Sequence, residues 1–61
     1  MTRQEYEERK NNIMIWMYSA LTSHCPRTAR ARARDLARLT EEYSGTPYID
    51  IYNKLLEEYN L

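Results

Sequence analysis

Every glycine and proline of this chain lies in one of two short stretches, "SHCP" at residues 23–26 and "SGTP" at residues 44–47. Proline cannot continue a helix from the residues before it, and glycine readily takes the left-handed conformation that ends a helix. The two stretches therefore separate three segments that are rich in Ala, Leu, Arg and Glu, which are good helix formers. We expect an all-α fold: a single helical domain spanning residues 1–61, built as a compact three-helix bundle with helices at about 3–23, 27–43 and 47–60.

Start and stop signals support these boundaries. Thr2 is followed three positions later by Glu5, which is the spacing of a capping box at the start of the first helix. Gly45 is predicted to cap the end of the second helix in the left-handed conformation. Thr46 is the predicted N-cap of the third helix, with Pro47 at its first position.

Each predicted helix has one apolar side when its residues are placed at about 100° per residue. In the first helix this side consists of Tyr6, Ile13, Met17, Ala20, Leu21 and His24. In the second helix it consists of Ala29, Ala33, Leu36, Leu39, Thr40 and Tyr43. In the third helix it consists of Tyr48, Ile51, Tyr52, Leu55, Leu56 and Tyr59. We expect these three sides to enclose one core.

The run "IMIWMY" at residues 13–18 makes the first helix apolar all the way round. A chain of 61 residues is near the lower size limit for a stable core, and two neighbouring helices cannot cover every side of a third. We therefore expect Ile15, Trp16 and Tyr18, called here the Trp16 patch, to form an interface. A second copy of the chain, in a homodimer or higher oligomer, is the favoured occupant. The alternatives are that another protein covers the patch, or that the chain is a monomer whose N-terminal segment bends and whose Tyr18 hydroxyl reaches water.

Charge is segregated along the chain, although the formal net charge is zero. Five arginines and one aspartate give residues 27–38 a net charge of +4, whereas five acidic residues and one lysine give residues 41–61 a net charge of −4. Four of the arginines fall within an arc of about 80° on the second helix. They are called here the arginine ridge and consist of Arg27, Arg30, Arg34 and Arg38.

Three interpretations of the arginine ridge remain open, because guanidinium groups bind both carboxylates and phosphates through planar, paired donors. The ridge can pair with Glu41, Glu42, Glu57 or Glu58 of its own chain or of a second copy. It can bind an acidic patch on a partner protein. It can also bind the phosphates of nucleic acid or a nucleotide, with steep salt dependence. The zero net charge, and the lack of Asn, Gln or Ser along "RARARDLARLTEEY" to read base edges, count against nucleic acid.

Arg32 lies apart from the ridge, near the edge of the apolar side. A long side chain in such a place usually extends its charged end to water or pairs with a carboxylate. We expect Asp50 or a neighbouring glutamate to be the partner of Arg32.

The sequence contains no constellation of catalytic or metal-binding residues. His24 and Cys25 are too few to close a zinc site, and one cysteine cannot form a disulfide within the chain. No phosphate-cradling loop or nucleophile elbow occurs, and the paired glutamates point about 100° apart on a helix. We therefore predict that the protein is not an enzyme and uses no cofactor and no metal.

The polar N-terminal residues do not fit a signal peptide, and the apolar run falls short of the roughly 20 residues that span a bilayer. We expect a cytoplasmic protein that does not associate with membranes. Its predicted function is that of a small non-enzymatic binding protein: a regulator, an adaptor or an inhibitor of the kind that phages and mobile elements encode. It is predicted to occupy a partner surface through the arginine ridge and the Trp16 patch. The alternative is an oligomeric binder of nucleic acid or nucleotide phosphates through the same ridge.

Overall fold

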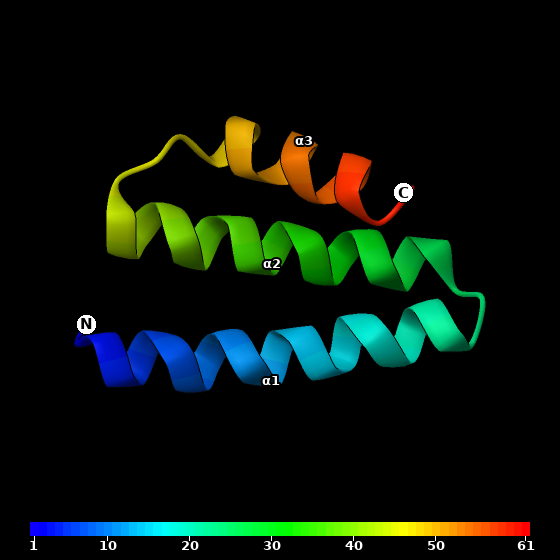
Figure 1. Cartoon of the computed structure of the whole chain (residues 1–61), viewed down its shortest axis with the longest axis horizontal. Coiled ribbons are helices and arrows are strands. Elements are labelled where there is room, and N and C mark those ends of the chain that lie inside the picture. Colours follow the sequence, from blue (N-terminus) through cyan, green and yellow to red (C-terminus); the bar gives the residue numbers. More distant parts are fainter.

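The computed structural model describes all 61 residues and contains three helices and no strand: α1 (Arg3–Thr22), α2 (Pro26–Ser44) and α3 (Tyr48–Glu58). α2 lies between α1 and α3 and runs antiparallel to both (Figure 1). The molecule measures 33 × 21 × 14 Å. The predicted all-α, three-helix fold is confirmed, with helix ends within two residues of the expected ones.

The predicted signals at the start of α1 and the end of α2 are present. The Thr2 hydroxyl oxygen accepts a hydrogen bond from the Glu5 amide at 3.2 Å. The Glu5 carboxylate contacts the Thr2 hydroxyl at 3.4 Å, whereas a full capping box uses the Thr2 amide. Gly45 has φ of 78° and donates its amide to the Glu41 carbonyl at 2.8 Å, so the left-handed cap is confirmed.

The start of α3 differs from the prediction, because Pro47 and not Thr46 is the N-cap. The Thr46 amide donates to the Ser44 hydroxyl at 3.3 Å, which holds Thr46 in the loop. The Tyr48 amide donates instead to the Glu41 carboxylate at 2.6 Å. A negative side chain from α2 therefore satisfies an orphan amide at the positive end of α3.

The core is small and is centred on the alanines of α2. Met17 is the one large side chain that is completely buried, and α3 has no fully buried residue. Alanine leaves α2 narrow, so the larger side chains of α1 and α3 pack closely over it. The buried residues are Met17, Ala20, Ala29, Ala33, Leu36, Ala37 and Leu39. Four of them, Met17, Ala20, Ala29 and Ala33, form one cluster between α1 and α2. The half-buried side chains that pack against this cluster are Met14, Leu21, Tyr52, Leu55, Tyr59 and Leu61.

Two residues assigned to apolar sides lie elsewhere. His24 is exposed in the turn after α1, with φ of 57°, because the helix ends at Thr22. Tyr43 is 38% exposed at the rim, where its ring stacks on that of Tyr6 with centroids 4.3 Å apart. Ala37 is completely buried, although the predicted apolar side of α2 did not include it.

Candidate functional site

The Trp16 patch lies on the outer side of α1, away from the core. Ile15 is 64% exposed and Trp16 is 65% exposed, which makes them the most exposed large apolar side chains of the chain. Ile15 is two residues from the buried Met17, so the two side chains point about 160° apart on the helix. The structure therefore leaves two large apolar side chains of α1 facing solvent.

Tyr18 forms one edge of the Trp16 patch and connects it to the end of α3. It is 48% exposed, and its hydroxyl oxygen lies 3.1 Å from that of Tyr59. The two rings pack edge to face, with centroids 5.9 Å apart. The hydrogen bond with Tyr18, followed by partial burial, raises the pKa of Tyr59 from 10.0 to about 12. Tyr18 is thus held in place within the single chain.

The arginine ridge lies on α2 beside α3, since Arg30 contacts Leu61 and Arg38 lies near Tyr48. Arg27, Arg34 and Arg38 are exposed, and none of them forms an ion pair. The Arg38 guanidinium lies 5.8 Å from the centre of the Tyr48 ring. Arg30 is half-buried and donates to the Leu61 carbonyl at 3.4 Å, so it helps to hold the last residues against α2.

The single chain does not neutralise its own ridge. The expected pairing of these arginines with Glu41, Glu42, Glu57 or Glu58 is absent within the chain, where Arg32–Asp35 is the one ion pair. Glu41 instead accepts from the amide at the start of α3. Pairing of the ridge with glutamates of a second copy stays a prediction.

Arg32 has a different partner from the one expected. Its guanidinium lies 3.3 Å from the carboxylate of Asp35, three residues later on the same helix. Its Nε is buried without a hydrogen-bond partner. Both side chains are 40% or more exposed, so we assign the pair no more than about 0.5 kcal/mol of stability.

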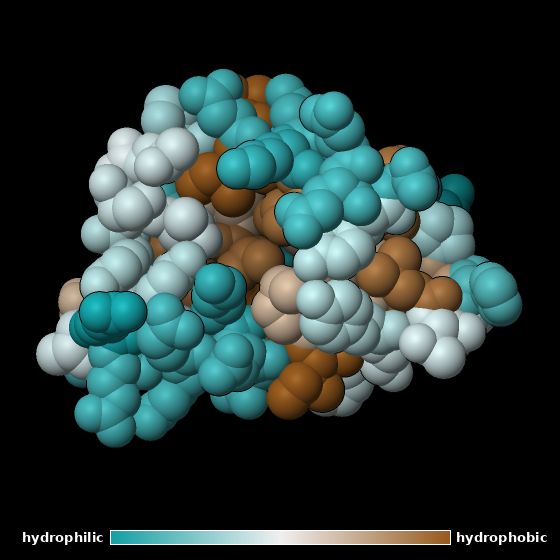
Figure 2. Space-filling view, in the orientation of Figure 1, coloured by the Kyte–Doolittle hydropathy of each residue, from teal (hydrophilic) through white to brown (hydrophobic).

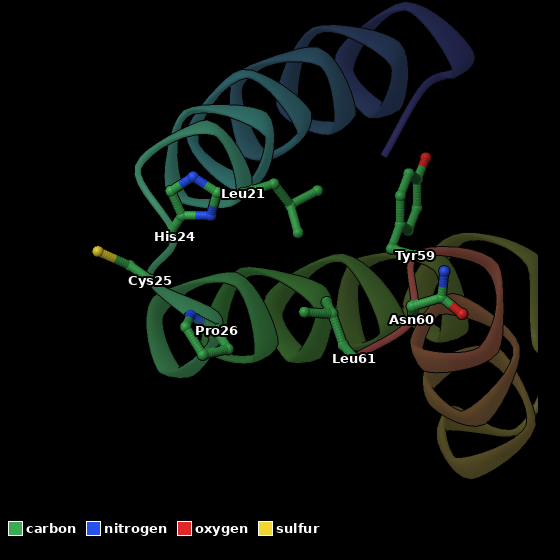
Figure 3. A pocket seen from close by; sticks show the side chains of 7 residues that line it. All are labelled: Leu21, His24, Cys25, Pro26, Tyr59, Asn60 and Leu61. Carbon is green, nitrogen blue, oxygen red and sulfur yellow. The ribbon is translucent and has the colours of Figure 1, made fainter.

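An open pocket of about 410 Å³, which the sequence did not indicate, lies where the turn between α1 and α2 meets the end of α3 (Figure 3). Leu21, Tyr59 and Leu61 give it apolar walls, whereas the sulfur of Cys25 points away from it. The Cys25 thiol lies 3.5 Å from the Ser23 carbonyl. The complete lining is Leu21, His24, Cys25, Pro26, Tyr59, Asn60 and Leu61. No group of three or more His, Cys, Asp or Glu side chains is arranged to hold a metal ion.

The ridge and the Trp16 patch are separate surfaces. Arg30 and Arg38 contact residues of α3 or the segment after it, whereas Ile15 and Trp16 lie on the outer side of α1. Figure 2 shows brown apolar surface in the region of α2 and α3 and a second brown area at the lower edge, where α1 lies. Both surfaces can therefore be occupied at the same time.

Comparison with protein-family models found no match, and searches of the curated proteins and of the solved structures found no similar chain. None of the three helices combines the length and the apolar character needed to cross a membrane.

Proposed function

We propose that the protein is a small cytoplasmic binding protein without enzymatic activity, which self-associates through the Trp16 patch and occupies an acidic surface of a partner protein through the arginine ridge. As such it acts as a regulator, an adaptor or an inhibitor of the kind found in phages. One observation carries the proposal: Arg27, Arg34 and Arg38 are exposed on one side of α2 and have no carboxylate partner in their own chain.

The arginine ridge lies on the one helix that packs against both of the others. α2 is the central helix and packs against both α1 and α3, so its backbone is fixed before a partner binds. Binding then orders only the arginine side chains, which lowers the entropic cost of association. Paired hydrogen bonds from guanidinium to carboxylate add orientation to the attraction of charge.

An acidic protein suits this ridge better than a nucleic acid does. α3 lies beside the ridge and exposes Asp50, Glu57 and Glu58 against the single cation Lys54. A nucleic acid backbone needs an extended positive surface, and these carboxylates repel it. A compact acidic patch on a protein can contact the arginines of α2 without lying over the carboxylates of α3.

The test compares two triple variants that remove the same charge. The ridge variant is Arg27→Gln, Arg34→Gln and Arg38→Gln, which keeps Arg30 because it contacts Leu61. The control is Arg3→Gln, Arg9→Gln and Lys54→Gln, at exposed positions outside the ridge. Each protein is immobilised, exposed to an extract of its own host with and without nuclease, and washed at increasing salt concentration.

We expect the wild type and the control to retain the same acidic protein, and the ridge variant to lose it. The same partner on all three proteins, or none on any of them, contradicts the proposal. Bound material that nuclease removes contradicts it in favour of the phosphate-binding alternative.

A further inference from the structure

We infer that the outer side of α1 is covered by α1 of a second copy, and that the two helices run antiparallel and cross near Ile15 and Trp16. This inference rests on the self-association in the proposed function and adds which helix of the second copy covers the Trp16 patch and in which direction that helix runs.

The small core supplies the reason for a second copy. Seven of the 61 residues are buried, and one large side chain, Met17, is completely buried. Two other large side chains, Ile15 and Trp16, lie on the surface and are 64% and 65% exposed. Small domains with few buried side chains commonly gain their missing stability by association. The formal net charge of zero adds no overall repulsion between two copies.

The charges of α1 select the antiparallel direction. They all lie in its first half, at Arg3, Glu5, Glu7, Glu8, Arg9 and Lys10, whereas residues 11–23 carry none. Glu8 is seven residues before Ile15 and so lies on the same outer side. A parallel pair places Glu8 beside its own copy, and like charges in such positions repel. An antiparallel pair crossing at residues 15–16 overlaps the uncharged segments and sets Glu8 beside Thr22 or Ser23.

The outer side also has a shape that fits a copy of itself. Asn12 and Ser19 lie about one turn to either side of Ile15, and both are exposed. These shorter polar side chains leave space beside Ile15 and Trp16 for the same two side chains of the other copy. Each such contact occurs twice, because a two-fold axis at the crossing point relates the two copies, as in most homodimers. The arginine ridges stay free, because they lie on α2.

A single label on the outer side of α1 reports the direction of the pair. Gln4 is exposed and lies about eleven residues before Ile15, on the same side of the helix. At 1.5 Å of rise per residue, an antiparallel pair separates the two Gln4 residues by roughly 35 Å. A parallel pair brings them within about 10–15 Å, close to the spacing of packed helices. The experiment measures the mass by light scattering, and then the distance between spin labels attached to the protein with Gln4→Cys and Cys25→Ser.

We expect twice the chain mass of 7.4 kDa and a label separation of roughly 35 Å. The variant Ile15→Ser with Trp16→Ser should be a helical monomer that unfolds at a lower urea concentration than the wild type. Its control, Ile49→Ser, removes an isoleucine that is 55% exposed on α3 and should stay a dimer. A monomeric wild type overturns both the self-association and this inference. A dimer with the short label distance overturns this inference alone. A dimer that survives the double substitution overturns the Trp16 patch as the interface, both here and in the proposed function.

Discussion

The hydroxyl oxygens of Tyr18 and Tyr59 lie 3.1 Å apart, and their hydrogen bond joins the outer edge of α1 to the residue that caps α3. All six tyrosines of the chain are paired in this way or by stacking. The pairs are Tyr6 with Tyr43, Tyr18 with Tyr59, and Tyr48 with Tyr52. A protein this thin has mostly half-buried positions, where a ring with a polar tip fits better than phenylalanine.

The Tyr18–Tyr59 contact makes stability depend on pH in the alkaline range. The pKa of Tyr59 is raised from 10.0 to about 12, so the folded protein keeps a proton that the unfolded chain loses above pH 10. This contribution is complete below pH 10 and is lost as the pH rises to about 12. Absorbance titration should show one tyrosine ionising later than the others. In Tyr18→Phe that late step should move towards 10, and six equivalent tyrosines in the wild type would contradict the assignment.

Glu41→Ala should destabilise the protein by about 1 kcal/mol, because it removes the carboxylate that accepts from the Tyr48 amide at the start of α3. Glu42→Ala is the matched control, since Glu42 is exposed and has no side-chain hydrogen bond. It should change the free energy of unfolding by less than about 0.5 kcal/mol. Urea unfolding followed by circular dichroism measures both, and equal effects would show that Glu41 is not a cap.

Gly45→Ala should cost about 1 kcal/mol, because φ of 78° is a left-handed conformation that a Cβ atom disfavours. A Cβ atom at this position meets no other atom within 4 Å, so the cost comes from the backbone alone. Gly45→Asn should cost less, since asparagine tolerates this conformation better. The midpoints of thermal unfolding rank the three proteins, and alanine as stable as glycine would contradict the left-handed cap.

Ala33→Leu should destabilise the protein by about 1–3 kcal/mol, because Ala33 is completely buried in the cluster with Met17 and a longer side chain forces the helices apart. Ala31→Leu makes the same change at a position of α2 that is only half-buried, and it should cost less. Denaturant unfolding of the two variants provides the comparison. Similar losses at both positions would mean that α1 and α3 do not approach α2 closely at Ala33.

The sequence predicted the local features of the fold well. The Thr2 cap, Gly45 and most of each apolar side depend on residues a few positions apart, and these interactions are set by the helix period and by backbone sterics. The cap of α3 was missed because Glu41 reaches Tyr48 across the loop from another helix. His24 was misplaced because its spacing continues the apolar side of α1, whereas the helix ends before it.

For the candidate site, the sequence predicted which residues share a side of a helix. It did not predict what each side chain contacts once the helices pack. Arg30 belongs to the ridge by its spacing, yet it donates to the carbonyl of Leu61, 31 residues away. The pocket between Leu21 and Tyr59 forms where two distant segments meet, so no local pattern indicates it.

Native mass spectrometry of the protein isolated gently from its own host measures the number of chains and any bound partner together. We expect a complex of two chains with a bound acidic protein, and two chains alone for the Arg27→Gln, Arg34→Gln, Arg38→Gln variant. A single chain of 7.4 kDa with nothing attached would contradict this expectation.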